Sequence, residues 1–132
     1  MQSEPHAGGG FWKARLRSFR NAGRGLAELL CAPKNARIHL AATVAVIAAG
    51  LFLRVSRDEW CALILAIALV WMAEGANTAI ELLADRVSRE HDELIRRAKD
   101  IAAGAVLIAA ISAAIVGAII LATRAWAVVR GG

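Results

Sequence analysis

The sequence lacks the short motifs by which many enzymes bind nucleotides or activate a serine nucleophile. It has no G-x-x-x-x-G-K-[ST] phosphate loop, no kinase glycine loop and no G-x-S-x-G nucleophile elbow. The glycines at positions 8–10 do not form a phosphate loop, because no strand precedes them and no GK[ST] follows. Any phosphoryl transfer by this chain would need a different architecture.

Cysteine is scarce, and the histidines are scattered. Cys31 and Cys61 flank the first long apolar run, so we expect them near opposite membrane faces, too far apart for a disulfide. His6, His39 and His91 lack metal-ligand spacing, and we expect a helix-start or interfacial role for His39. Residues 1–30 lack the apolar core, roughly 7–15 residues long, of a cleavable signal peptide, so none is expected.

Polar residues are too few to hide the apolar ones from water. Hydrophobic residues make up 58% of the 132, against roughly 45–50% in soluble proteins. They gather in runs at 38–53, 60–84 and 101–123. The first run, with its flanks, approaches the roughly 20 residues of a membrane-spanning helix, and the other two are longer than that. The sequence therefore predicts an all-α membrane protein with transmembrane helices at 36–54, 60–84 and 101–123.

The remaining segments are polar or amphipathic. Residues 1–10 resemble a disordered tail, and apolar residues recur at helical spacing through 11–30 with arginines on the other faces. This pattern predicts an amphipathic helix in the membrane interface, ended by Pro33. Residues 85–100 are expected to form a cytoplasmic loop, and 124–132 a C-terminal tail.

The net charge of +5 is unevenly distributed. Of the 16 cations, seven precede residue 38, two lie at 54–59, five at 85–100 and two in the tail. With three spans, the first and third of these regions share a side, and cations favour the cytoplasm. We therefore expect a multi-pass protein of the cell inner (plasma) membrane with its N-terminus inside and its C-terminus outside. No nucleic-acid-reading motif accompanies the charge, so nucleic acid is not an expected partner.

The second apolar run carries an acidic face. On a helix, Asn77, Thr78, Glu81 and Asp85 all point within about 60° of the direction of Glu74. The shared face extends about 16 Å from Glu74 to Asp85. An acid in the hydrocarbon core costs at least roughly 2.5 kcal/mol on insertion scales, so the acids need a reason. One reason is a hydrogen-bonded cluster that joins helices. However, two carboxylates repel unless a cation or proton intervenes.

The charged segment 85–100 holds five acids and five bases. Such runs are usually solvated and salt-bridged. Beside an acidic membrane face, this one is also a candidate site for a polyanion with a divalent metal, because acids hold Mg²⁺ and Lys or Arg neutralise phosphate oxygens.

Together these segments resemble the prokaryotic diacylglycerol kinase family, which includes undecaprenol kinases. The resemblance extends from about Arg17 to Leu121 and depends on a run of motifs: Glu74-Gly-Ala-Asn77-Thr78-Ala-Ile-Glu81, Asp85-Arg86, Glu90-His91 and Ala98-Lys99-Asp100-Ile-Ala-Ala-Gly-Ala-Val-Leu. It implies a homotrimer of three-span subunits, each with a surface helix, that uses ATP and Mg²⁺ to phosphorylate a membrane lipid alcohol.

The resemblance also implies residue roles. Glu74 matches the catalytic base that contacts the substrate hydroxyl, and Glu81 matches a glutamate that binds both the metal and ATP. The rest of the ATP site would comprise Glu90, His91, Asp92, Lys99 and Asp100, with Asn77 and Asp85 in support. Many members have a second metal-binding glutamate where this chain has Pro33, so either Glu28 replaces it or water and phosphate oxygens complete the shell.

Several functions stay open at this point. Diacylglycerol is the usual substrate of the family, whereas the stretch Asn35-Ala-Arg37-Ile-His39-Leu and the stretch from Ala102 look closer to the undecaprenol kinases. From a different class, a small proton- or cation-coupled transporter would also use intramembrane acids. A purely structural membrane protein is the remaining alternative. Neither of the last two predicts ATP hydrolysis that depends on an added lipid alcohol.

Overall fold

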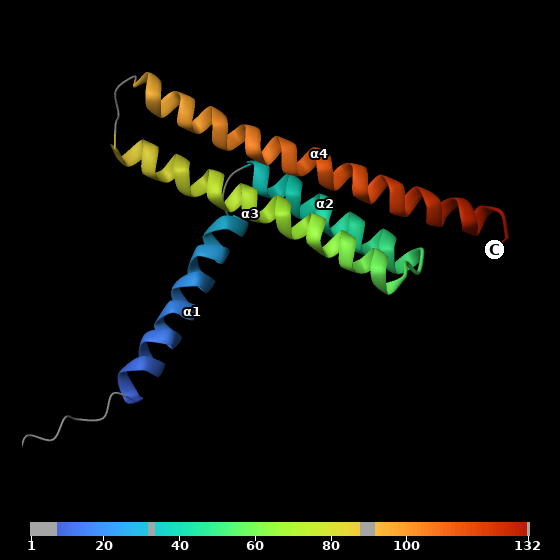
Figure 1. Cartoon of the computed structure of the whole chain (residues 1–132), viewed down its shortest axis with the longest axis horizontal. Helices are drawn as coiled ribbons and strands as arrows, with labels where there is room; N and C mark the ends of the chain where they lie inside the picture. The colour runs from blue at the N-terminus through green and yellow to red at the C-terminus, as the bar shows by residue number, and fades with distance from the viewer. Residues whose placement is uncertain (1–7, 32–33, 88–91, 132) are drawn as a thin grey trace, which may run out of the picture.

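The computed structural model describes residues 8–31, 34–87 and 92–131, and of residues 34 and 35 the backbone alone. These residues form four α-helices: α1 (Gly8–Cys31), α2 (Lys34–Phe52), α3 (Arg57–Val87) and α4 (Glu93–Val129). α3 and α4 pack together along their length as an antiparallel hairpin, α2 lies against them, and α1 projects away from the bundle (Figure 1). The predicted all-α class is confirmed. The expected helix end at Pro33 and most of the expected N-terminal tail, residues 1–10, lie outside the described residues.

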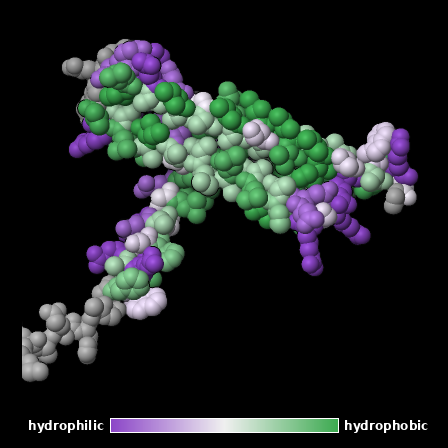
Figure 2. All heavy atoms as spheres, viewed as in Figure 1, coloured by the Kyte–Doolittle hydropathy of each residue, from purple (hydrophilic) through white to green (hydrophobic). Residues whose placement is uncertain are grey.

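The helices α3 and α4 are each long and apolar enough to cross a membrane. A third span follows if α1 and α2, whose axes differ by 94°, count as one bent pair. On the face shown in Figure 2, hydrophobic residues cover the middle of the bundle, hydrophilic residues gather toward its ends, and α1 carries both kinds. The chain is therefore a membrane protein. The three separate spans at 36–54, 60–84 and 101–123 remain a prediction.

The helices extend beyond the apolar runs. α3 continues to Val87 and α4 begins at Glu93, so much of the expected 85–100 loop is helical, as is most of the expected tail after residue 123. The reason is local. The Asp92 side chain caps α4 by accepting hydrogen bonds from the backbone of Leu94 and Ile95. Arg96 then pairs with Glu93 and Asp100, at the spacings that stabilise a helix surface.

A tight turn joins α2 to α3. Arg54 adopts a left-handed φ of 51°, and the backbone N–H of Val55 donates to the Gly50 carbonyl at 3.1 Å. Ser56 and Glu59 then form a capping box, in which each side chain accepts from the other's backbone N–H. A Cβ at Gly50 would lie 2.9 Å from the Trp60 ring, so glycine permits the close approach of α2 and α3 here.

An ion pair closes each end of the α3–α4 hairpin. At the N-terminal end of α3, next to the turn from α2, the Glu59 carboxylate accepts hydrogen bonds from the Arg124 guanidinium at 2.6–2.9 Å. At the opposite end, Lys99 Nζ donates to Asp85 Oδ1 at 3.0 Å. The hydrogen bond from Arg124, together with the backbone N–H of Ser56, lowers the pKa of Glu59 to about 2. Both pairs link α3 to α4, and the Glu59–Arg124 pair is the less exposed of the two.

Candidate active site on the polar face of α3

The polar face of α3 is graded in burial. Glu74 and Asn77 are each only 4% exposed, Thr78 and Glu81 are half-buried, and Asp85 is exposed. Helix geometry makes this face, because the spacings 3, 4, 7 and 11 return to nearly the same direction. The structure therefore places the five residues along one line, from the packed interior to the charged end of the bundle.

Two buried oxygens on this face have no hydrogen-bond partner in the described part of the chain. One is Glu74 Oε2 and the other is Asn77 Oδ1. The amide nitrogen of Asn77 donates to Glu81 Oε1 at 3.1 Å, which orients both side chains. An unsatisfied buried polar atom is costly, on the order of 1–3 kcal/mol, so each oxygen is a candidate contact for a ligand or a moving neighbour.

His39 on α2 approaches this face. Its Nε2 lies 3.9 Å from Glu74 Oε2, and both side chains are largely buried, at 16% and 6% exposure. The His39 ring also meets the Trp71 ring edge to face, with centroids 6.5 Å apart. Trp71 in turn donates to Thr43 Oγ1 at 3.1 Å. The sequence analysis missed this contact, because an isolated histidine gives no signal of what faces it across two helices.

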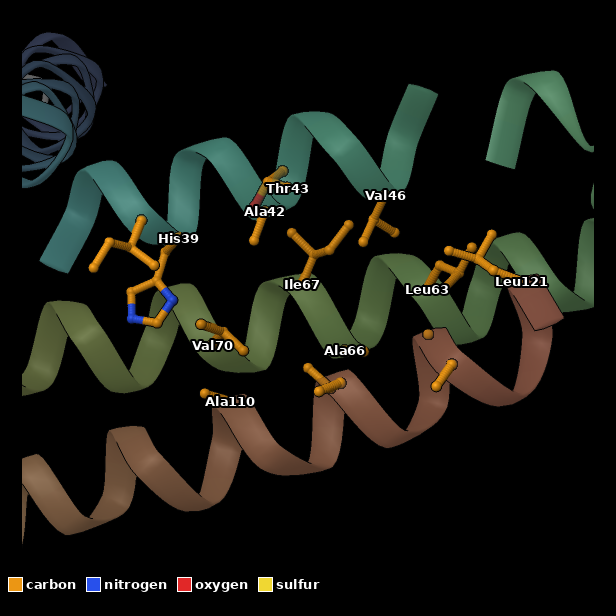
Figure 3. Close-up of a pocket in the computed structure, with 15 residues that line it drawn as sticks. His39, Ala42, Thr43, Val46, Leu63, Ala66, Ile67, Val70, Ala110 and Leu121 are labelled. Carbon is orange, nitrogen blue, oxygen red and sulfur yellow. The ribbon is translucent and has the colours of Figure 1, made fainter. Parts of the chain in front are cut away.

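An apolar groove begins beside His39. It encloses about 420 Å³ between α2, α3 and α4 and extends toward Leu63 and Leu121. Figure 3 shows His39 at one end of this groove, followed by small and branched side chains such as Ala42, Thr43 and Val70. The groove thus has a polar end, near Glu74, and a long apolar remainder.

Glu28 lies on the α1 side of the same region. A second groove is lined by α1, through residues that include Gly25, Leu26 and Glu28, and by α3, through residues that include Glu81 and Asp85. Leu29 approaches α3 closely enough that a Cβ on Gly75 would lie 3.4 Å from its Cδ2. Glu28 therefore shares a groove with Glu81, as a replacement metal ligand would need to. Within the described residues, no three His, Cys, Asp or Glu side chains come together as a ready metal cage.

The charged end of α4 supplies the remaining predicted residues. Lys99 pairs with Asp85, and Asp100 pairs with Arg96. Asp92 serves as the helix cap described above, a role that its position in the sequence did not reveal. Glu90 and His91, which were predicted for the ATP site, lie outside the described residues. The structure thus brings Lys99 directly to the α3 face, whereas Asp92 and Asp100 hold helix contacts.

Comparison with known proteins gives consistent matches. The family model described as prokaryotic diacylglycerol kinase matches residues 20–121. The chain is 38% identical over 105 residues to the undecaprenol kinase of Bacillus subtilis, covering 80% of this chain and 85% of that protein. It is 43% identical over 107 residues to the diacylglycerol kinase of Synechocystis sp., covering 80% of this chain and 61% of the relative. The match to the diacylglycerol kinase of Escherichia coli is 48% over 59 residues, or 45% of this chain and 48% of that one.

Proposed function

Because the chain belongs to the prokaryotic diacylglycerol kinase family, we propose that it transfers the γ-phosphoryl group of ATP to the hydroxyl of a membrane lipid alcohol. The observation that carries this proposal is the face of α3. A buried carboxylate with an unpartnered oxygen lies at one end of it, and an acidic and basic surface lies at the other. Such a face can receive a lipid hydroxyl from the bilayer and a polyphosphate from water.

Glu74 is the proposed general base and substrate contact. Its Oε2 is buried and free to accept a hydrogen bond from a hydroxyl group. In the reaction, the lipid oxygen forms a bond to the γ-phosphorus while the bond to the bridging oxygen of ADP breaks. The hydroxyl proton passes to the Glu74 carboxylate, and ADP carries away the electron pair of the broken bond.

The acidic residues fit a magnesium ion. Mg²⁺ is usually bound by one or two carboxylates, with water and phosphate oxygens completing the shell. Glu81 and Glu28 line one groove, and the Asn77 amide holds one oxygen of Glu81. These are the residues we propose for the metal, which when bound would neutralise charge on the transferring phosphoryl group.

Lys99 is the proposed phosphate contact. Its side chain is 39% exposed and pairs with the side chain of Asp85, which is 70% exposed. A solvent-exposed pair of this kind contributes little to stability, so Lys99 can exchange Asp85 for a phosphate oxygen at low cost. Asp100 and Asp92, together with Glu90 and His91, complete the proposed ATP site.

The proposed enzyme is a homotrimer in the cell inner membrane. Many large apolar side chains of α2, α3 and α4 are exposed, among them Leu65, Met72, Ile108 and Ile119. In a membrane protein these can face either lipid or another copy. The distribution of cations supports a cytoplasmic N-terminus and an external C-terminus.

Two substrates are proposed for the same chemistry. Diacylglycerol would give phosphatidic acid, and undecaprenol would give undecaprenyl phosphate. The activities of the relatives favour neither substrate, since the Bacillus subtilis protein is an undecaprenol kinase and the Synechocystis protein a diacylglycerol kinase. A proton- or cation-coupled transporter would use Glu74 and Glu81 without making a phosphorylated lipid.

The deciding experiment uses the full-length protein in mixed micelles with radiolabelled ATP, Mg²⁺ and one lipid alcohol at a time. We expect a labelled lipid with either diacylglycerol or undecaprenol, and no labelled lipid without added alcohol. The chromatographic mobility of the product identifies the substrate. Absence of a labelled lipid with every alcohol would contradict the proposed function.

A further inference from the structure

We propose that His39 is a positioning residue that holds the Glu74 carboxylate in the orientation required for proton transfer. This inference rests on the proposed function of Glu74 as the base. Glu74 is buried, and its Oε2 has no hydrogen-bond partner within the described residues. A carboxylate in that state can rotate, and a base must be fixed within hydrogen-bond reach of the proton that it takes.

His39 is placed to supply the missing contact. Its Nε2 lies 3.9 Å from Oε2, which is longer than a hydrogen bond by about one ångström. Contacts at catalytic groups are often long before substrate binds and shorten in the complex. A small rotation of either side chain would bring an N–H of His39 onto Oε2, and other lone pairs of the carboxylate would remain for the lipid hydroxyl.

The surroundings of His39 restrict its ring. Trp71 packs against it edge to face, and the hydrogen bond from Trp71 to Thr43 fixes that indole between α2 and α3. His39 also forms the polar end of the apolar groove, where the ring projects from α2 between the helices (Figure 3). The ring is therefore held in place from α2 and α3, next to Glu74 Oε2, one of the two buried oxygens of this face that lack a partner within the described residues.

A simple packing role makes a different prediction. If His39 only filled space, a leucine of similar size would serve, and glutamine would be no better. If it donates to Glu74, leucine removes the donor, whereas glutamine retains an N–H near the position of Nε2. Misplacing a catalytic group by about 1 Å can cost up to about 10²-fold in rate, which sets the scale of the expected effect.

The kinetic test compares His39→Leu and His39→Gln in the full-length protein. We expect His39→Leu to lower kcat by up to about 10²-fold with little change in the KM for ATP, and His39→Gln to recover most of the loss. In a Glu74→Gln background, His39→Leu should cause no further loss. Val46→Ala, two turns away on the same groove wall, is the matched packing control and should leave kcat near that of the unmodified protein.

A spectroscopic test does not depend on activity. The chain has three histidines, so ¹⁵N-histidine labelling gives a simple spectrum in which His39→Gln identifies the His39 signals. We expect Glu74→Gln to shift the ring-nitrogen resonances of His39 and to leave those of His6 and His91 in place.

The outcomes separate the two proposals. Unchanged His39 resonances in Glu74→Gln would overturn the positioning role, as would equal activity of the leucine and glutamine variants. An active parent protein with an unimpaired His39→Leu variant would overturn the positioning role alone. A parent protein that phosphorylates no lipid alcohol would overturn the proposed function and this role with it.

Discussion

At the scale of single residues, burial divides the carboxylates of this protein into groups with different chemistry. Glu74 is packed among helices, Glu81 is half-buried, and Asp85 and Glu93 are exposed to solvent. A buried carboxylate oxygen without a hydrogen-bond partner, such as Glu74 Oε2, can accept a hydrogen bond from a substrate hydroxyl. A half-exposed one can bind a hydrated cation, and an exposed one pairs with mobile lysine or arginine side chains.

The first prediction concerns Glu74. Replacement by glutamine keeps the shape and the hydrogen bonding but removes the ability to take a proton. Since a general base contributes roughly 10²–10⁴-fold to rate, Glu74→Gln should lower kcat by about that factor. Oligomer size and ATP affinity should persist, as measured by light scattering and nucleotide binding. A variant that fails to assemble would instead indicate that Glu74 joins helices. Turnover above about a tenth of the parent's, with assembly intact, would indicate that the proton passes to an acceptor other than Glu74.

Asp85→Asn is the matched control for this experiment. Asp85 lies on the same face of α3 but about 16 Å along the helix from Glu74. Its substitution should alter the use of ATP or metal, because it frees Lys99 from an ion pair, and should leave the proton-transfer step intact. Identical pH–rate profiles for the two variants would show that the division of roles along α3 is wrong.

The second prediction concerns the metal. Glu81→Gln should raise the Mg²⁺ concentration needed for half-maximal activity, because it removes a charged ligand from the groove shared with Glu28. Glu28→Gln should have a smaller effect of the same kind if Glu28 takes the place of the glutamate that Pro33 replaces. Titration of activity with Mg²⁺ at fixed ATP measures both. An unchanged Mg²⁺ dependence in Glu81→Gln would remove this residue from the metal site.

At the scale of elements, the α3–α4 hairpin is the rigid frame that carries the polar face. Its two ion pairs differ in environment. Arg124 and Glu59 are 35% and 23% exposed and share several hydrogen bonds, whereas Lys99 and Asp85 are more exposed and share one. We therefore expect the Glu59–Arg124 ion pair to persist, whereas the Lys99–Asp85 pair can separate when a phosphate competes for Lys99.

The third prediction follows from the pKa of Glu59. Contacts with Arg124 and Ser56 lower this pKa from 4.5 to about 2. A carboxyl group whose pKa is lowered by folding contributes its full stabilisation above its ordinary pKa, and the contribution fades as pH falls toward the folded value. The thermal unfolding temperature in micelles should therefore fall between about pH 4.5 and pH 2.

Glu59→Gln should remove part of this pH dependence and lower the unfolding temperature near neutral pH. Glu93→Gln is the control. Arg96 lowers the pKa of Glu93 as well, but that pair lies within one helix and is well exposed, so its loss should change the curve little. An identical pH dependence in Glu59→Gln and the parent would show that the Glu59–Arg124 ion pair does not stabilise the hairpin.

At the scale of the whole molecule, charge and hydropathy set how the bundle sits in a membrane. On the face shown in Figure 2, the apolar middle of the bundle separates two hydrophilic ends, and α1 carries both kinds of residue. Seven cations precede residue 38 and five lie at 85–100, against two at 54–59 and two after residue 123. Since cations favour the cytoplasm, the Asp85 end of α3 should face the compartment that contains ATP.

The fourth prediction tests this orientation with reporter fusions. An enzyme active only after export should work when fused after Gly132, and one active only in the cytoplasm should work when fused before Phe11. The expected result depends on an odd number of spans. Equal sidedness for the two ends would contradict three spans, and would favour α1 and α2 as a broken pair that does not cross.

Several features were determined by the sequence alone. Long apolar runs require helices, since lipid offers no hydrogen-bond partners for an open backbone. The helical repeat then places Glu74, Asn77 and Glu81 on one face whatever surrounds them. The resemblance to the family was also visible in the sequence, because its motifs are short and continuous along the chain.

Other features were decided only by tertiary structure. His39 and Glu74 are 35 positions apart, and Glu59 and Arg124 are 65 apart, so no local pattern could pair them. The helical extension through residues 93–100 depends on the Asp92 cap and on the ion pairs of Arg96, and charge alone does not distinguish this arrangement from a solvated loop. Glu28 meets the groove of Glu81 only because α1 ends beside α3. Periodicity assigns a residue to a face of its own helix, but the packing of helices decides which faces meet.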